Sequence, residues 1–254
     1  MNQVASDKPL GSAGISSRAG AVFGQVEQVF DDVWWAYGTT RLGPGVVFPR
    51  TMTIIREPDG LVVIHPVLMP PPQQAQIEAI GVIKHIVRLG AFHSMDDFAY
   101  VERYAPTVWA PAGVDLHPGV VVHHQLEPGG QLPTKGSVLF SFERSRSPEN
   151  ALLLDRNGGL LVTCDSVQNW ERTDGCSLLG ALVSRFIGFR GRACIGPPWL
   201  KASSPDDGEG MAPDFKRLLA LNFRHAIGGH GGPMLDTAKE DLRLQTRRVF
   251  GFVS

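Results

Sequence analysis

Short runs of apolar residues, separated by turn residues, are the dominant pattern along this chain. Apolar runs bounded by Gly, Pro, Asn or Ser are typical of β-strands. We therefore expect strands over residues 26–37 at a sheet edge, 51–56, 61–65, 84–89, 107–110, 120–122, 137–140, 151–154 and 160–163. A turn at 57–60 joins two of these strands into a hairpin. The second strand of that hairpin is apolar at almost every position, which predicts burial on both faces.

In other segments the apolar residues recur at helical spacing. We expect helices over residues 73–80, the later part of 93–104, 178–187, 214–226 and 237–250. Asp214, with Pro213 before it, is a good N-cap for the helix that it begins. Strands alternate with helices in the first half of the chain, which implies parallel strands joined by helical crossovers. The sequence therefore predicts an α/β fold.

Length and composition narrow the class of protein. A chain of 254 residues is long enough for one large domain. Residues 1–20 are polar and rich in Gly and Ser, so we expect a flexible leader followed by a single domain over 21–254. The three cysteines have no Cys-x-x-Cys spacing, which argues against a disulfide framework and a zinc–cysteine site.

The charge and the apolar runs exclude some partners. A net charge of -1 lacks the basic excess of a nucleic-acid-binding protein. No apolar run approaches the ~20 residues of a membrane helix, and the N-terminus has no apolar core of signal-peptide length. We therefore expect a soluble cytoplasmic protein with a small-molecule substrate or ligand, and neither nucleic acid nor membrane as partner.

Two segments carry the candidate chemistry. Residues 158–165 are a glycine turn, a short apolar strand and then Asp165, and residues 228–231 place His230 among glycines. A carboxylate directly after a buried strand is costly unless it has a cation, a metal ion or N–H groups as partners. The glycines allow the backbone near His230 to approach a site closely, although simple turn chemistry also explains them. An acid at a strand tip and a histidine in a tight loop can converge on one metal ion.

Other common catalytic signatures are missing from the sequence. There is no Gly-x-Ser-x-Gly nucleophile elbow after a strand and no phosphate-binding glycine loop.

The order of several segments resembles the metallo-β-lactamase superfamily. Residues 51–65 look like its opening hairpin, and residues 82–104 look like the strand, loop and helix that carry its His-x-His-x-Asp-His motif. Residues 145–150 look like its Gly-His-Thr-Pro-Gly-Ser turn, 164–165 like its Gly-Asp, and 229–231 like its final Gly-His-Gly. The resemblance implies an αββα sandwich of two mixed sheets flanked by helices, with the metal site at one edge of the sheets.

Only part of the family's ligand set matches. His93 stands at the first histidine of the motif and Asp97 at its aspartate, while Asp165 and His230 match the later aspartate and histidine. The resemblance then implies one divalent ion, which is zinc, iron or manganese, held by His93, Asp97, Asp165 and His230. Asp97 and Asp165 are also the candidate catalytic carboxylates, because either can orient a water molecule. Read without the family pattern, His93 is an exposed or capping loop residue and Asp97 caps a helix.

Four positions depart from the family pattern. Met95 and Phe98 stand where the other two histidines of the motif belong, and Arg146 replaces the histidine of the turn. A guanidinium at this position can pair with one of the two candidate carboxylates or hold an anionic substrate. His65 takes the place of the aspartate that ends the opening hairpin, and its simplest interpretation is a histidine at the edge of the core.

Two hypotheses about function follow. The first is a divergent hydrolase that uses one metal ion on an ester, amide, thioester or phosphoester, with Arg146, Asn169 and Trp170 contacting the substrate. The second is a metal-free relative that has kept the fold and binds a small ligand or a protein.

Overall fold

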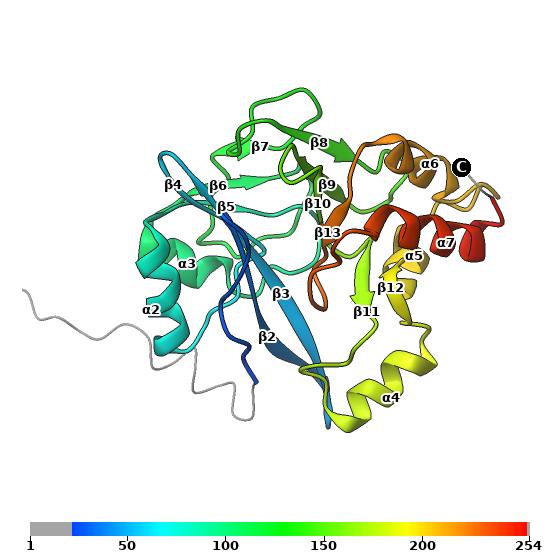
Figure 1. Cartoon of the computed structure of the whole chain (residues 1–254), viewed down its shortest axis with the longest axis horizontal. Coiled ribbons are helices and arrows are strands. Elements are labelled where there is room, and N and C mark those ends of the chain that lie inside the picture. Colours follow the sequence, from blue (N-terminus) through cyan, green and yellow to red (C-terminus); the bar gives the residue numbers. More distant parts are fainter. Residues whose placement is uncertain (1–21, 253–254) are drawn as a thin grey trace, which may run out of the picture.

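Two β-sheets packed face to face form the centre of the molecule, in a computed structural model that describes residues 22–252 (Figure 1). The expected leader, residues 1–20, lies outside the described residues. The larger sheet has strand order β1-β2-β3-β4-β5-β6-β7 and the smaller one β13-β10-β9-β8, and β11 pairs with β12 beside them. The bounds of the strands are β1 Glu27–Phe30, β2 Val33–Gly43, β3 Val46–Glu57, β4 Gly60–Ile64, β5 Ile83–Val87, β6 Thr107–Ala110, β7 His124–Gln125, β8 Ser137–Ser141, β9 Asn150–Leu154, β10 Leu160–Thr163, β11 Gln168–Trp170, β12 Gly191–Cys194 and β13 His225–Ile227.

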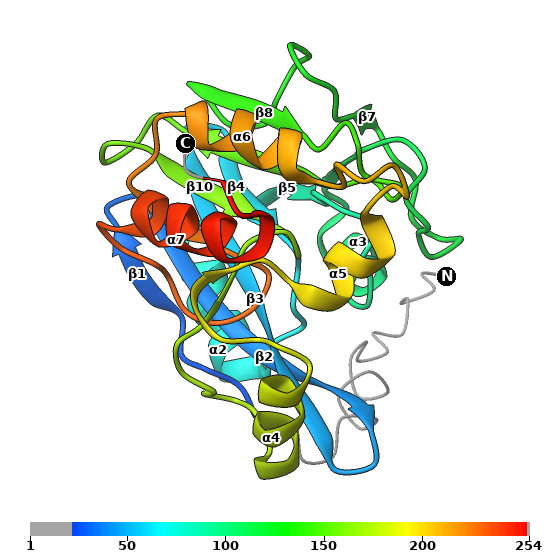
Figure 2. The ribbon, with the colours of Figure 1, turned by 90° about the vertical axis from the view of Figure 1, so that its right-hand side faces the viewer.

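Helices cover the outer faces of both sheets. Their bounds are α2 Pro71–Ile80, α3 Asp97–Tyr104, α4 Leu178–Phe186, α5 Pro197–Ser203, α6 Ala212–Ala220 and α7 Ala238–Phe250. In Figure 1, α2 and α3 lie beside the larger sheet, and α5, α6 and α7 lie on the opposite side beside the smaller sheet. Figure 2, turned by 90°, shows α5, α6 and α7 in front of the strands. None of the described helices is long and apolar enough to cross a membrane.

Three apolar clusters fill the spaces between these four layers. Ile77 and Tyr100 bury the inner faces of α2 and α3 against the larger sheet. Ile64 and Val162 belong to the cluster between the sheets, and Phe215 to the cluster under the outer helices of the smaller sheet. Because apolar residues are buried on both faces of each sheet, the predicted αββα sandwich of mixed sheets is confirmed.

The larger sheet changes from antiparallel to parallel at β4. β1 to β4 form an antiparallel meander, and the predicted hairpin is present with Thr53 opposite Ile64. From β4 onward the strands run parallel, with α2 crossing from β4 to β5 and α3 from β5 to β6. The predicted parallel pairing with helical crossovers is therefore confirmed. The consequence for the site is that the carboxyl ends of β4 and β5 lie at the same edge.

The helix expected over 214–226 is wrong in its second half. α6 runs from Ala212 to Ala220, and residues 225–227 form β13, which pairs in parallel with β10. Asp214 lies in the first turn, while Met211 is the N-cap. The backbone N–H groups of Arg224 and His225 both donate to the carbonyl of Gly159, so sheet pairing outweighs the helical spacing of the apolar residues.

Two strand predictions also need correction. The segment 26–37 contains two strands, β1 and the start of β2, because a turn at 31–32 folds it into a hairpin. The expected strand over 120–122 is absent from the described structure, and β7 begins at His124 instead. Val121 and Val122 are 67% and 37% exposed, so an apolar run here has no second layer to cover it.

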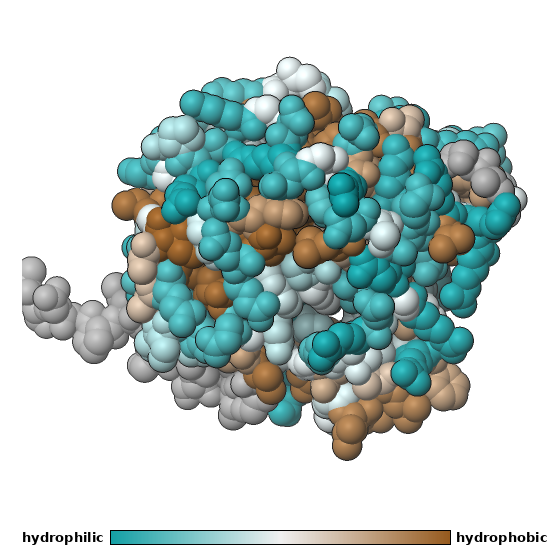
Figure 3. All heavy atoms as spheres, in the orientation of Figure 1, coloured by the Kyte–Doolittle hydropathy of each residue, from teal (hydrophilic) through white to brown (hydrophobic). Residues whose placement is uncertain are grey.

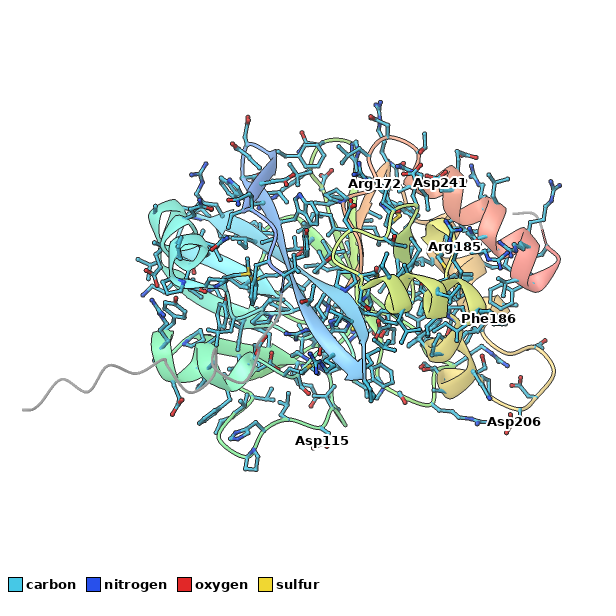
Figure 4. The ribbon with its side chains drawn as sticks, turned by 90° about the horizontal axis from the view of Figure 1, so that it is seen from below. Asp115, Arg172, Arg185, Phe186, Asp206 and Asp241 are labelled. Atoms are coloured by element: carbon cyan, nitrogen blue, oxygen red, sulfur yellow. The ribbon has the colours of Figure 1, made fainter. Side chains whose placement is uncertain are left out.

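Helix α4 differs from the other helices because its apolar side chains face outward. The small residues Gly180 and Ser184 face the protein, while Leu178 and Phe186 are 94% and 86% exposed. Apolar spheres gather at the lower right of Figure 3, where Figure 1 places α4. Figure 4 shows Arg185 beside Phe186 on this helix. The fold therefore places an apolar helix surface next to the β2–β3 hairpin, against which α4 packs.

Candidate functional site

Four residues that follow strand ends meet at one edge of the sandwich. His65 comes directly after β4 and His93 lies in the loop after β5, both from the larger sheet. Asp165 follows β10 and His230 follows β13, both from the smaller sheet. Parallel neighbours end at the same edge, so each sheet delivers two side chains to the same place. We call His65, His93, Asp165 and His230 the histidine–aspartate cluster.

The carboxylate of Asp165 is the centre of this cluster. Its Oδ1 atom lies 3.2 Å from Nε2 of His93 and 3.2 Å from Nε2 of His230. The ring centres of His93 and His230 are 4.8 Å apart, and those of His65 and His93 are 5.4 Å apart. Burial alone would raise the pKa of Asp165, but the two neighbouring imidazoles hold that pKa well below its usual value. Asp165 is therefore ionised. The structure also brings His93, Asp165 and His230 together, as the sequence predicted.

A second buried acid, Glu149, accepts hydrogen bonds from the backbone at Asp165. Its Oε1 accepts the backbone N–H of Asp165 at 3.1 Å and that of Ser166 at 2.8 Å. Its Oε2 is buried without a hydrogen-bond partner, and burial, together with the charge of Asp165, raises the pKa of Glu149 to about 8. Gln168 completes the support by donating to Oδ1 of Asp165 at 2.8 Å. These contacts fix the direction in which the Asp165 carboxylate points.

The sequence did not single out Glu149. A signal was present, because Glu149 directly precedes the buried strand β9, much as Asp165 follows β10 after one further buried residue. An acid bordering a buried strand needs partners in either case.

Glycines allow the loop of His230 to lie close to its neighbours. A Cβ atom on Gly229 would lie 2.8 Å from the carbonyl oxygen of Cys164 and 2.9 Å from Nε2 of His93. Gly231 has φ +79°, and a Cβ there would lie 1.9 Å from the carbonyl oxygen of Asn169. The predicted close approach of this loop to the site is confirmed.

The protonation of His230 is constrained by its other nitrogen. Nδ1 lies 2.6 Å from the carbonyl oxygen of Pro49. A carbonyl oxygen only accepts hydrogen bonds, so Nδ1 carries the proton. In the neutral ring, Nε2 then carries no proton, and it lies 3.2 Å from Oδ1 of Asp165. Two acceptors at this distance require a cation between them or a second proton on the ring.

His65 is the unexpected member of the cluster. It is 2% exposed, and both of its ring nitrogens are buried without a hydrogen-bond partner. Burial and the neighbouring His93 lower the pKa of His65 well below its usual value, so the ring is neutral. The interpretation as a simple histidine at the edge of the core missed that β4 ends beside the loop of His93.

Comparisons with known proteins place this geometry in a known fold. No family model matches the chain, and no curated protein matches its sequence. A search of solved structures matches the metallo-β-lactamase FIM-1 from Pseudomonas aeruginosa in its mono-zinc form, at 14% identity over 90% of this chain and 95% of that chain, with a TM-score of 0.59. The DIM-1 metallo-β-lactamase matches at 8% identity over 89% and 99% of the two chains, with a TM-score of 0.63.

The chain has the metallo-β-lactamase fold. A third structure, a metallo-β-lactamase from Erythrobacter litoralis, agrees at 11% identity over 93% of this chain and all 100% of that one, with a TM-score of 0.56. The resemblance noted in the sequence is thus confirmed as a divergent version of this fold. Because fold alone does not give function, the chemistry depends on the residues of the site.

The aspartate at the motif position, Asp97, pairs with a guanidinium in this structure. Oδ2 of Asp97 lies 2.9 Å from Nη1 of Arg88, and both side chains are buried. Arg88 also donates to the carbonyls of Gly90 and Ala91 at 3.3 and 3.4 Å. Burial raises the pKa of Asp97 to about 6 even though Arg88 opposes the shift. Asp97 therefore forms an ion pair with Arg88. Because Arg88 also bonds the backbone of Gly90 and Ala91, this pair connects α3 to the loop that carries His93.

Arg146 lies apart from both candidate carboxylates in the described structure. Its guanidinium is about half exposed and pairs with Asp206 on the loop between α5 and α6. Figure 4 places Asp206 at the periphery of the molecule. The neighbouring Arg144 pairs with Asp207 on the same loop. The pairing of Arg146 with Asp165 or Asp97 that the sequence allowed is not the one observed.

Asn169 and Trp170 lie next to His230. The backbone N–H of Asn169 donates to the carbonyl of His230 at 3.0 Å, and its side-chain amide donates to Gly232 at 3.0 Å. The ring of Trp170 stacks at 5.7 Å from that of His230, and Trp170 is 5% exposed. These two residues hold the position of His230, so contact with a substrate stays a prediction for both.

Met95 and Phe98, which replace histidines of the motif, each contact different residues. Met95 is 61% exposed, and its sulfur accepts a hydrogen bond from the hydroxyl of Thr40 at 3.4 Å. Phe98 stacks on the ring of His117 at 4.0 Å. Neither side chain offers a strong metal ligand, so the nitrogen donors of this site must come from the cluster.

The cluster nonetheless suits a divalent metal ion. It offers imidazole nitrogens and a carboxylate, a donor set that zinc, iron and manganese accept. Ligand atoms of His93, Cys164 and Asp165 lie within 4.8 Å of one another. Burial raises the pKa of the Cys164 thiol well above its usual value, which disfavours the thiolate that binds metal. The ring nitrogens of His65, which have no hydrogen-bond partner, and Nε2 of His230 are further candidate ligand atoms.

Proposed function

We propose that this protein is a mononuclear metal-dependent hydrolase acting on a small-molecule ester, amide, thioester or phosphoester. His93, Asp165 and His230 would hold the ion, which is zinc, iron or manganese. A bound divalent ion supplies an activated water and polarises the substrate oxygen that it contacts. The fold supports this proposal, and the arrangement of His230 is the observation that carries it.

The hydrogen bond from His230 to Pro49 leaves Nε2 without a proton in the neutral ring, 3.2 Å from a carboxylate oxygen of Asp165. Two ligands on one tetrahedral zinc ion, with bonds of 2.0–2.2 Å, lie about 3.4 Å apart. The two observed nitrogen–oxygen distances from Asp165 are close to that value.

The surrounding residues have positioning roles in this proposal. Glu149 and Gln168 orient the Asp165 carboxylate, and the carbonyl of Pro49 fixes the tautomer of His230. Such outer contacts commonly set the orientation of metal ligands. Asp97 acts through Arg88 on the loop of His93, so in this proposal Asp97 is a positioning residue and Asp165 the carboxylate at the reacting centre.

The substrate side of the proposal rests on fewer contacts. Trp170 forms an apolar wall behind His230. Arg146 offers a half-exposed cation for an anionic substrate once its pairing with Asp206 is released.

A cytoplasmic location remains part of the proposal and is tested by cell fractionation.

A specific observation favours the metal-free alternative as a second candidate. Arg88 already supplies a buried positive charge to Asp97, a position at which the family's motif has a metal ligand. The second buried carboxylate, Asp165, lies between two imidazoles that hold its pKa well below its usual value. The protein would then be a relative that binds a small ligand or a protein.

The test is the metal content of the native protein, purified without chelator and measured by plasma mass spectrometry. We expect about one ion per chain in the wild type and in His117→Ala, whose exposed histidine serves as the control. We expect the ion to be lost in His230→Ala. The absence of metal from all three proteins would overturn the hydrolase proposal and favour the metal-free candidate.

A further inference from the structure

His65 differs from the other enclosed histidines in its hydrogen bonding. His225 uses both ring nitrogens, with Nε2 2.9 Å from the carbonyl of Asn157 and Nδ1 accepting the N–H of Asp236 at 2.9 Å. His85 also uses both, with Asp59 at 3.2 Å and the indole N–H of Trp109 at 3.1 Å. His65 uses neither, although at 2% exposed it is the most buried of the three.

Leaving these nitrogens without partners is energetically costly. A neutral imidazole has one donor and one acceptor, and each buried group that stays unpaired costs about 1–3 kcal/mol. Native proteins rarely retain such groups without a reason. A phenylalanine or leucine would fill the same space without this cost. The histidine at position 65 therefore points to a partner that binds imidazole nitrogen.

The backbone of His65 supports the same conclusion. Its φ is +54°, in the left-handed region, and His93 has φ +72°. Such conformations are uncommon outside glycine, cost of the order of 1–3 kcal/mol, and cluster at functional sites. The N–H of His65 still pairs with the carbonyl of Val87 at 3.0 Å, so the sheet register holds the strand end in place. Two histidines of one cluster thus have a positive φ, which is uncommon outside glycine.

The neighbours of His65 identify the kind of partner. Its ring centre is 5.4 Å from that of His93, whose Nε2 faces Asp165. His65 therefore adjoins an imidazole that pairs with a carboxylate, and imidazole and carboxylate together are a donor set that transition-metal ions accept. The nearby cation Arg88 only donates hydrogen bonds, and it is occupied by Asp97 and two carbonyls.

We propose that His65 is the fourth protein ligand of the metal ion, beside His93, Asp165 and His230. The inference rests on the proposed function and adds one donor to it. The ligand set is then three imidazoles and one carboxylate, drawn equally from the two sheets. The third imidazole compensates for the motif histidines that Met95 and Phe98 replace.

The experiment is a Co²⁺ titration of the full-length protein, followed by the visible ligand-field spectrum and by competition with a chelator. Four proteins are compared: the wild type, His65→Asn, His65→Phe and His230→Ala. Asparagine tolerates the left-handed backbone, and phenylalanine fills the space of the ring without nitrogen atoms. Circular dichroism and thermal unfolding of the metal-free proteins check that each variant folds.

We expect the wild type to bind one Co²⁺ per chain, and both His65 variants to bind it more than about 100-fold more weakly with a changed spectrum. Removing a group that only orients a ligand costs about 10–100-fold, so a larger loss marks a ligand. A wild-type spectrum in folded His65 variants, with affinity within tenfold, would overturn this inference and leave the proposed function intact. If the wild type binds no Co²⁺, both are overturned.

Discussion

At the scale of single residues, breaking the buried pair of Arg88 and Asp97 should cause a large loss in the free energy of unfolding. Arg88→Met leaves the Asp97 carboxylate enclosed without its cation and frees the carbonyls of Gly90 and Ala91. Breaking one side of a buried pair costs about 3–5 kcal/mol. We expect that loss in the free energy of unfolding, measured in urea by tryptophan fluorescence.

The matched control is Arg103→Met, which breaks a pair with Glu78 in which both side chains are 40–48% exposed. Exposed pairs contribute about 0–1 kcal/mol. Equal losses in the two variants would show that burial does not give the Arg88 pair its importance.

The two aspartates of the sequence-based ligand set are predicted to behave differently. In Asp97→Asn we expect the metal content to remain near that of the wild type, because Arg88 already occupies that carboxylate. In Asp165→Asn we expect the metal to be lost, because this carboxylate faces the imidazoles of His93 and His230. Metal per chain, measured on folded samples of both variants, decides between them. The reverse pattern would restore Asp97 as a ligand.

The thiols give a pH-dependent prediction. All three cysteines are free; Cys164 and Cys194 are buried and Cys176 is partly exposed. Burial and the charge of Asp174 raise the pKa of Cys176 to about 11, and only the thiolate reacts with disulfide reagents. At pH 8 about one molecule in a thousand carries that thiolate, and the fraction rises tenfold per pH unit up to the pKa. We expect a single slow reacting thiol in the native protein, with a rate that follows this rise, and three thiols after unfolding. A fast native reaction at pH 7 would contradict this.

At the scale of elements, the spacing of apolar residues predicted those strands and helices whose formation depends on residues near them in the sequence. The strands with turns at both ends, such as β4 and β10, were predicted almost to the residue because their apolar runs are buried on both faces. β13 was misread as the end of a helix, because its pairing with β10 joins residues more than sixty positions apart. β11 and β12 were missed for a similar reason, since each is short and pairs only with the other. Contacts of this kind leave little trace in the spacing of apolar residues.

The attachment of α4 to the β2–β3 hairpin depends on one serine. Ser177 caps the helix by accepting the N–H of Gly180 at 2.9 Å, accepts the N–H of Val47 at 3.1 Å, and donates to the carbonyl of Gly45 at 2.6 Å. Loss of an N-cap alone costs about 1 kcal/mol, and here two tertiary bonds are lost with it. We expect Ser177→Ala to lower the free energy of unfolding by roughly 1–2 kcal/mol and to speed proteolysis within α4.

Leu178→Gln is the control for that variant. Leu178 is 94% exposed, so its replacement should change the free energy of unfolding by no more than about 0.5 kcal/mol. A greater loss in Leu178→Gln than in Ser177→Ala would mean that the exposed apolar stripe, rather than the cap, holds α4 in place.

At the scale of the whole molecule, the order and packing of the strands bring the residues of the site together. The sequence predicted His93, Asp165 and His230 as partners because a known order of motifs links them. It missed His65 because nothing local reveals that β4 ends beside the loop of His93. It missed Glu149 because an acid before a buried strand signals only a need for partners, and not that its partner is the backbone after β10. Only the face-to-face packing of the two sheets, which brings their edges together, shows that these side chains share one place. The same packing means that any ion in the cluster joins the larger sheet to the smaller one.

A ligand that bridges the two sheets should stabilise the entire fold. An ion that binds only the native state, present at 100 times its Kd, adds about 2.7 kcal/mol to the free energy of unfolding. For a domain of this size that corresponds to a rise in Tm of roughly 5–11 °C. We expect this rise in a calorimetric scan of the wild type with added Zn²⁺ or Co²⁺, and its reversal by a chelator. His93→Ala removes one ligand from the larger sheet, so the same addition should leave its Tm unchanged. An equal rise in that variant would place the stabilising ion elsewhere on the protein and separate it from the cluster.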